Sequence, residues 1–142
     1  MSQAKPIPNG YHSVQPYVML KSCAAAIPFY IQAFGAKEKL RMSDPERGIV
    51  HAEIEIGDSV IMMADEAPKM DAYSVEHFGG SPISLLIYTE DCDAMYARAL
   101  AAGATSLREP ADQSYGDRVA GVKDPFGYKW WIATSIKEVA TQ

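Results

Sequence analysis

The sequence lacks the features that mark nucleic-acid-binding, membrane-spanning and exported proteins. Its 142 residues carry a net charge of −5, and the 13 Lys and Arg residues are scattered, so we expect no nucleic-acid partner. No apolar run approaches the roughly 20 residues that cross a bilayer, so we expect no membrane partner. The first residues, Met-Ser-Gln-Ala-Lys-Pro, lack an apolar signal core, which predicts a cytoplasmic location.

Cysteine is also scarce, because the chain has only Cys23 and Cys92, each near the start of an expected helix. A disulfide framework would need more cysteines. A helix N-terminus can lower the pKa of a thiol, but the sequence identifies no base beside either residue, so we predict buried side chains and no nucleophile. Hydrophobic residues make up 48% of the chain, and we expect residues 1–142 to form a single domain with its own core.

What the sequence does contain is one plan that occurs twice. About residues 12–66 contain a strand-like run, then a helix-like run that ends at Gly35, and then further strand-like runs that meet at Gly57. The same order, with the helix-like run ending at Gly103, fills about residues 83–136. The repeat predicts an α+β fold of two βαβββ modules in tandem that together form a cleft.

Two segments of this plan are irregular. Residues 67–82 contain Pro68, Gly79 and Gly80 and lack periodicity, so we interpret them as a linker or a lid between the modules. Pro28 falls inside the first helix-like run and should kink that helix or move its start to a later residue. The first strand is expected over residues 13–20.

Four groups of residues give the chain a resemblance to a known family. They are Ala26–Tyr30 (AIPFY) with Phe34–Ala36 (FGA), His51–Asp58 (HAEIEIGD), Tyr115–Arg118 (YGDR) and Asp124–Tyr128 (DPFGY). With these motifs the chain resembles the vicinal-oxygen-chelate superfamily of glyoxalase I, bleomycin-resistance proteins and extradiol dioxygenases. It looks most like the PhnB-like branch, over about residues 12–136.

The resemblance implies that each module has a curved sheet, that the two sheets form a cleft, and that the protein is a homodimer. In the metal enzymes of that superfamily, four inward-facing strand positions hold a divalent ion. In this sequence those positions fall on Gln15, Met62, Ser84 and Trp131. The last three are poor ligands for an ion that prefers carboxylate oxygen or imidazole nitrogen. We therefore expect no glyoxalase I activity and predict no cofactor, while a divalent metal at a relocated site stays open as an alternative.

The turn at Gly57 and Asp58 predicts which side chains share a face of the first sheet. If these two residues form the whole loop, Glu53 lies opposite Met62, and His51 and Glu55 share that face. By the family pattern this is the cleft face. The other face, Ala52, Ile54 and Ile56, is apolar and should pack on a helix.

The last hairpin is interpreted in the same way. With residues 124–127 as a four-residue loop, Trp131 lies opposite Ala120, and Arg118 shares the face of Trp131. The cleft is then predicted to bind a ligand through aromatic and Met side chains with a few polar groups. The predicted ligand-binding residues are Gln15, Tyr17, His51, Glu53, Met62, Ser84, Tyr88, Arg118 and Trp131.

Three functions fit these residues. The first is a protein that binds a small organic molecule without the usual metal site, as bleomycin-resistance members do. The second is a metal-dependent lyase, isomerase or dioxygenase-type enzyme with a relocated site around His51 and Glu53. The third is a metal-free enzyme with Glu53 or His51 as general base, in which burial raises the pKa of the carboxyl and Arg118 stabilises an anion. Solvated side chains, or an Arg118 paired with Asp117 or with a dimer partner, are the structural alternatives.

Overall fold

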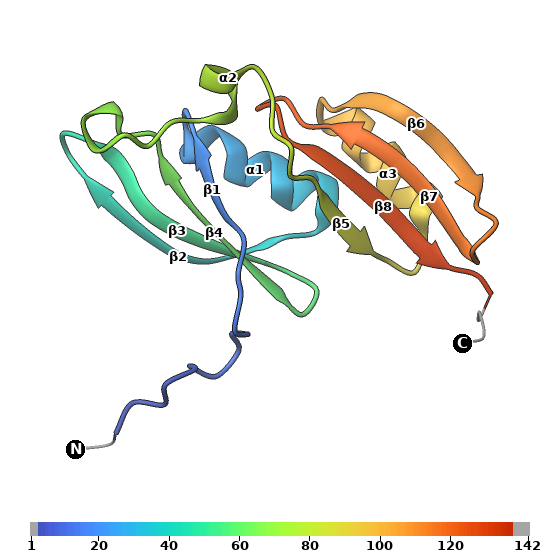
Figure 1. The fold of residues 1–142 in the computed structure, drawn as a ribbon, viewed down its shortest axis with the longest axis horizontal. Coiled ribbons are helices and arrows are strands. Elements are labelled where there is room, and N and C mark those ends of the chain that lie inside the picture. The colour runs from blue at the N-terminus through green and yellow to red at the C-terminus, as the bar shows by residue number, and fades with distance from the viewer. Residues whose placement is uncertain (1–2, 138–142) are drawn as a thin grey trace. The chain divides into compact units, whose positions relative to one another are not determined.

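The computed structural model describes residues 3–137, and it contains the predicted repeat (Figure 1). Two compact units are present. The first comprises the chain up to Ile31 and Gly35–Ser74, and the second comprises Gln32–Phe34 and the chain from Val75 onward. Each unit has one four-stranded sheet, so the predicted α+β fold with two βαβββ modules in tandem is confirmed. No helix within residues 3–137 is long and apolar enough to cross a membrane.

The first module consists of β1 (Tyr17–Leu20), α1 (Cys23–Phe34), β2 (Lys37–Asp44), β3 (Gly48–Ile56) and β4 (Ser59–Asp65). Its sheet has the order β1-β4-β3-β2, with β1 parallel to β4 and the other pairs antiparallel. The strand expected over residues 13–20 is shorter, because its pairing with β4 begins at Tyr17. The helix starts at Cys23 and continues through Pro28, so a later start was a wrong expectation.

The second module consists of β5 (Leu85–Tyr88), α3 (Cys92–Ala102), β6 (Thr105–Asp112), β7 (Asp117–Lys123) and β8 (Lys129–Ser135). Its sheet order, β5-β8-β7-β6, repeats that of the first. The connecting segment is not structureless. It holds a short 3-10 helix, η1 (Pro68–Met70), and one turn of helix, α2 (Val75–Phe78).

Side-chain caps start both long helices. Ser22 Oγ accepts from Ala25 N at 3.2 Å at the start of α1, and Asp91 Oδ1 accepts from Ala94 N at 3.0 Å at the start of α3. Gly35 ends α1 with φ 70°, a left-handed conformation that glycine adopts without steric cost. The carboxylate of Asp65, at the end of β4, fixes the first helix further by accepting from Cys23 N at 2.7 Å.

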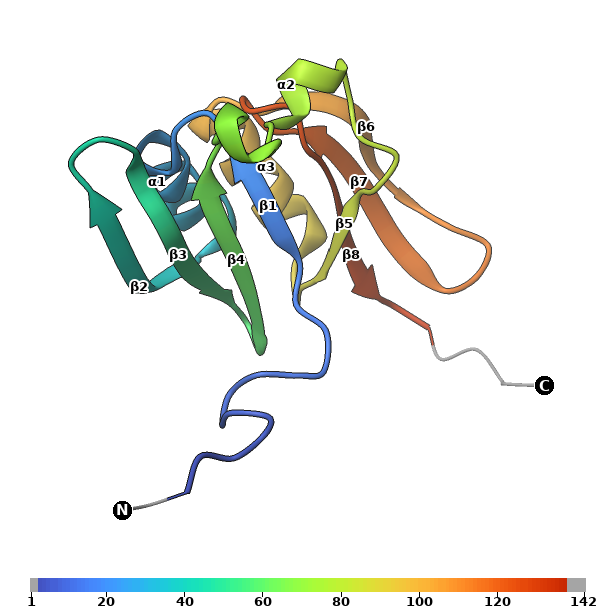
Figure 2. The same cartoon turned by 60° about the vertical axis from the view of Figure 1, so that its left-hand side comes forward.

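The first sheet buries the face that its alternation predicted. Ala52, Ile54 and Met63 are fully buried, and α1 lies on one side of this sheet (Figure 2). Both cysteines are free and buried, as predicted. Burial raises the pKa of the Cys23 thiol far above its ordinary value, and burial likewise raises that of Cys92. Neither thiol is therefore an activated nucleophile.

The two hairpins differ in how well their pairing was predicted. In the first, Glu53 pairs with Met62 and Glu55 with Val60, as a two-residue loop at Gly57 and Asp58 requires. In the second, Trp131 pairs with Gly121, and not with Ala120 as predicted. The shift by one residue arises because Tyr128 also belongs to the loop.

The carboxylate of Asp124 explains the longer second loop. Its Oδ1 accepts from Phe126 N and from Tyr128 N, both at 2.9 Å, so the backbone turns around the side chain as far as Tyr128. Its Oδ2 accepts from Trp130 Nε1 at 2.9 Å, and Asp124 itself is buried. The loop is therefore held by three donors to one carboxylate.

Candidate functional site

The face of the first sheet opposite its apolar core carries the predicted polar residues. Directly opposed residues place their side chains on the same face of a sheet, and Met62 pairs with both Tyr17 and Glu53. His51 pairs with Met42 and lies two residues from Glu53, on the same face. We call this surface the open face of the first sheet; it comprises Tyr17, Met19, Leu40, Met42, His51, Glu53 and Met62.

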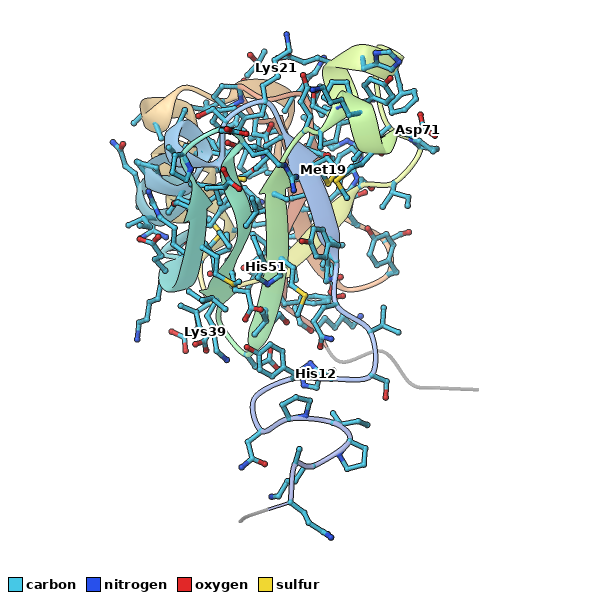
Figure 3. The ribbon with its side chains drawn as sticks, turned by 90° about the vertical axis from the view of Figure 1, so that its left-hand side faces the viewer. His12, Met19, Lys21, Lys39, His51 and Asp71 are labelled. Carbon is cyan, nitrogen blue, oxygen red and sulfur yellow. The ribbon has the colours of Figure 1, made fainter. Side chains whose placement is uncertain are left out.

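A chain of hydrogen bonds links four side chains on this open face. Tyr17 Oη lies 2.8 Å from His51 Nδ1, and His51 Nε2 lies 2.7 Å from Glu53 Oε2. The other oxygen of Glu53 accepts a hydrogen bond from Tyr11 Oη. We call Tyr17, His51, Glu53 and Tyr11 the polar chain. Figure 3 shows His51 and Met19 on this face, with His12 on the segment that precedes β1.

The proton positions in the polar chain follow from its chemistry. An ionised carboxylate only accepts hydrogen bonds, so His51 Nε2 carries the proton that it shares with Glu53. In the neutral ring Nδ1 is then an acceptor, and the hydroxyl of Tyr17 donates to it. Burial and the negative charge of Glu53 both raise the pKa of Tyr17, so this hydroxyl keeps its proton.

The pKa of Glu53 is lowered, whereas the hypothesis of a metal-free enzyme assumed that it is raised. Burial alone raises it, as that hypothesis assumed, since only 4% of the residue is exposed. The hydrogen bonds from Tyr11 and His51 outweigh burial, and the pKa falls below its ordinary value. Glu53 is therefore a stable anion and a poor general base near neutral pH.

The segment before β1 adds a hollow next to the polar chain. Residues of the segment 6–15, together with Met62 of β4, line an open space of about 480 Å³. Gln15 lies at its edge, where its Oε1 accepts from His12 N at 2.5 Å. The hollow is lined by Pro6, Ile7, Pro8, Tyr11, His12, Ser13, Gln15 and Met62. This lining is mostly apolar, with a few polar groups.

The second sheet has a corresponding open face. Trp131 pairs with Leu86 and Gly121, and Tyr88 pairs with Ala133, which places these side chains together. The indole of Trp131 donates from Nε1 to Ser84 Oγ at 3.1 Å. Tyr88 is 65% exposed, and its hydroxyl donates to Asp117 Oδ2 at 2.8 Å.

Arg118 does not lie on this open face, so its predicted place beside Trp131 was wrong. It pairs with Thr134 on the neighbouring strand, and the alternation of side chains along that strand places Thr134 on the face opposite Trp131. From there its guanidinium reaches Asp93 at 2.6 Å and Asp112 at 2.9 Å. Arg118 therefore joins β7 to the start of α3 and to β6 through Asp93 and Asp112, and not through Asp117, which was one of the structural alternatives.

The positions that the resemblance assigned to metal ligands occupy equivalent places in the two modules. Met62 in β4 pairs with Tyr17, and Trp131 in β8 pairs with Leu86. Gln15 and Ser84 each stand two residues before those partners in the chain. A thioether and an indole N–H that already donates to Ser84 do not fit a divalent cation.

The relocated metal site is not favoured either. Residues 3–137 contain no group of three or more His, Cys, Asp and Glu side chains placed to hold a metal ion. In the polar chain, both oxygens of Glu53 and both ring nitrogens of His51 already have hydrogen-bond partners.

Tyr11 was missed from the sequence. It lies in an aperiodic segment far from His51 in the chain, so no pattern connected it with Glu53. Lys39 Nζ lies 4.1 Å from the centre of the Tyr11 ring, a cation–π contact that helps to hold the ring in place. An aromatic residue between turn residues was the only available signal.

Comparison with known proteins agrees with the fold. The family model described as Glyoxalase/Bleomycin resistance protein/Dioxygenase superfamily matches residues 12–132. The protein Rv0887c of Mycobacterium tuberculosis is 35% identical over 130 residues, which cover 89% of this chain and 76% of the relative. The Arabidopsis thaliana protein At5g48480 is 29% identical over 116 residues, covering 76% and 69%.

Solved structures give the same result. TioX from Micromonospora sp. ML1 superposes with a TM-score of 0.68 at 23% identity, covering 92% of this chain and all (100%) of that one. The X-ray structure of the Arabidopsis At5g48480 product also gives 0.68, at 25% identity, with 87% and 98% covered.

Proposed function

The chain belongs to the Glyoxalase/Bleomycin resistance protein/Dioxygenase superfamily, and we propose that it binds a small organic molecule without a metal ion. The ligand lies against the open face of the first sheet, beside the hollow formed by residues 6–15. Family membership alone does not specify an activity, because one fold carries many functions, so the proposal rests on the side chains of the site.

The observation that carries the proposal concerns the equivalent positions of the two modules at which the metal enzymes of the family hold their ion. In this chain Met62 and Trp131 occupy two of these positions, and apolar side chains surround them. Tyr17 is 50% exposed beside Met62, and Leu86 is 51% exposed beside Trp131. Exposed aromatic and aliphatic groups on a sheet face favour contact with an organic ligand. The metal-dependent alternative has less support, because the ligand positions and the polar chain offer no free set of carboxylate and imidazole donors.

A titration tests the proposal. The purified full chain, kept in a chelator, is titrated with a panel of aromatic and amphipathic compounds while the heat of binding is recorded by calorimetry. We expect at least one compound to bind saturably in chelator, and Met62→Glu, which places a charge on the open face, to weaken that binding about tenfold or more. An exposed control, Asp58→Asn on the first hairpin loop, should bind as the wild type does. Binding that requires added Zn²⁺, Ni²⁺ or Mn²⁺ would overturn the proposal.

A further inference from the structure

The polar chain has one buried end and one accessible end. Glu53 is 4% exposed, whereas Tyr17 is 50% exposed and meets solvent at the open face of the first sheet. His51 lies between them, with hydrogen bonds of 2.8 Å and 2.7 Å to its two ring nitrogens. This order, from an accessible hydroxyl through an imidazole to a buried anion, is suited to moving a proton inward from a bound molecule.

We propose that the polar chain binds compounds with an acidic hydroxyl group, phenols or enols, as their anions and keeps the ligand's proton on His51. The inference rests on the proposed function and names the ligand class for the same site. The hydroxyl of Tyr17 donates to His51, and its oxygen keeps lone pairs that can accept from a ligand hydroxyl.

The proton transfer balances without another reactant. The ligand O–H bond breaks and its proton passes to Tyr17 Oη, while the original Tyr17 proton passes to His51 Nδ1. The products are a ligand anion that accepts from Tyr17 and an imidazolium that donates to Tyr17 and to Glu53. The total charge is unchanged, because one new anion and one new cation form together.

The surrounding charges favour the products of this transfer. The carboxylate of Glu53 stays ionised and lies 2.7 Å from the ring that becomes the imidazolium. Two cations reach the same region. The pKa of Tyr17 is raised overall, but the positive field of Arg47 lowers it in part. The positive field of Lys39 likewise lowers the pKa of Glu53. From β2, the neutral side chain of Met42 faces His51. A ligand anion at Tyr17 therefore meets positive fields from Arg47 and from the new imidazolium.

The apolar surface around Tyr17 selects the rest of the ligand. Met62 adjoins Tyr17 in the sheet, Met42 is 50% exposed opposite His51, and Leu40 is 37% exposed opposite Glu53. Thioether and aliphatic groups suit a flat aromatic or conjugated ring. A carboxylic acid gains nothing from the chain, since it is already ionised at neutral pH and has no proton to transfer.

Absorbance spectroscopy tests this directly. The probe is para-nitrophenol, whose anion absorbs in the visible range, and its methyl ether, para-nitroanisole, is the matched compound without a proton. With the wild-type chain in chelator, we expect the pKa of the bound phenol to fall by about one unit or more, a tenfold shift in its ionisation. In His51→Gln the amide can still donate to Glu53, and we expect the pKa of the bound phenol to stay at its value in free solution.

A second variant and a control distinguish the possible results. Tyr17→Phe retains the ring and removes the transfer path, so it should abolish the shift, while Tyr96→Phe, whose hydroxyl bonds to Ser106 on the second module, should preserve it. An unshifted pKa in the wild type, or the same shift in His51→Gln, would overturn the inference and leave the proposed function intact. Failure of both nitrophenol and nitroanisole to bind, while other panel compounds bind, would also overturn it. Failure of the whole panel would instead overturn the proposed function, and the inference with it.

Discussion

The indole of Trp131 lies directly over Gly121 on the neighbouring strand, in the space that a Cβ at residue 121 would fill. The contact places the indole on the open face of the second sheet, where Nε1 reaches Ser84. The absence of a side chain at Gly121 thus leaves room for the ring of Trp131. We expect Gly121→Ala to destabilise the fold by about 1–3 kcal/mol through overpacking and to shift the tryptophan emission.

Chemical denaturation and fluorescence measure this effect, and a double-mutant cycle isolates it. In a Trp131→Leu background the ring atoms that meet the new methyl group are absent, so Gly121→Ala should then cost much less. Equal destabilisation in both backgrounds would show that Trp131 does not depend on Gly121 for its position.

The pKa of Glu53 predicts a specific pH dependence. Its folded value lies below the ordinary 4.5, so the unfolded chain binds this proton more tightly. The contribution of Glu53 to stability is therefore complete above about pH 4.5 and is lost as the pH falls through the folded pKa. We expect Glu53→Gln to lower the free energy of unfolding by about 1–3 kcal/mol at neutral pH, because a buried hydrogen-bonded anion is replaced.

Urea unfolding at a series of pH values checks this prediction. The difference between wild type and Glu53→Gln should shrink on acidification, because the variant side chain does not titrate. A difference that grows as the pH falls would mean that burial dominates and that the folded pKa is raised, as the sequence-based hypothesis held.

Asp65 connects three elements of the first module. Its Oδ1 accepts from Cys23 N at 2.7 Å at the start of α1, and its Oδ2 accepts from Ile49 N at 3.0 Å in β3. Asp65→Asn replaces one acceptor by an NH₂ group that faces a backbone N–H. We expect a loss of about 1–3 kcal/mol in the free energy of unfolding. Asp58→Asn, on the exposed hairpin loop, is the matched control and should stay within about 0.5 kcal/mol of wild type.

Arg118 gives a prediction of no effect on binding. Its side chain lies on the face opposite Trp131 and pairs with Asp93 and Asp112, all at least one-third exposed. Exposed ion pairs contribute little to stability. We expect Arg118→Ala to leave the affinity for every panel ligand unchanged and to cause a small loss of stability that disappears in high salt. A marked loss of affinity with unchanged stability would return Arg118 to the ligand site.

The sequence predicted the strand pairing correctly where short-range rules determined the geometry. A two-residue turn at Gly57 and Asp58 leaves only one pairing, so the neighbours His51, Glu53 and Met62 were assigned to the correct face. The second hairpin was predicted with the wrong pairing, because Tyr128 N donates to the Asp124 side chain and Tyr128 therefore belongs to the loop. One extra loop residue moved Trp131 opposite Gly121 and placed Arg118 on the other face.

The hydrogen-bonding partners within the site were beyond sequence patterns. Tyr11 reaches Glu53 from an aperiodic segment, so neither the polar chain nor the lowered pKa of Glu53 was predictable. Residue types alone suggested a carboxyl with a raised pKa, because they show burial and not the donors that compensate for it.

Paired calorimetric titrations distinguish ligand binding that needs no metal from binding that depends on one. One sample is stripped with chelator and verified metal-free by elemental analysis, and the other is supplied in turn with Zn²⁺, Ni²⁺, Mn²⁺ and Fe²⁺. We predict the same dissociation constant for a panel ligand in all samples and no stoichiometric metal uptake. Uptake of one ion per chain with an affinity gain of about tenfold or more, 1.4 kcal/mol, would show instead that the ligand binds through a metal ion.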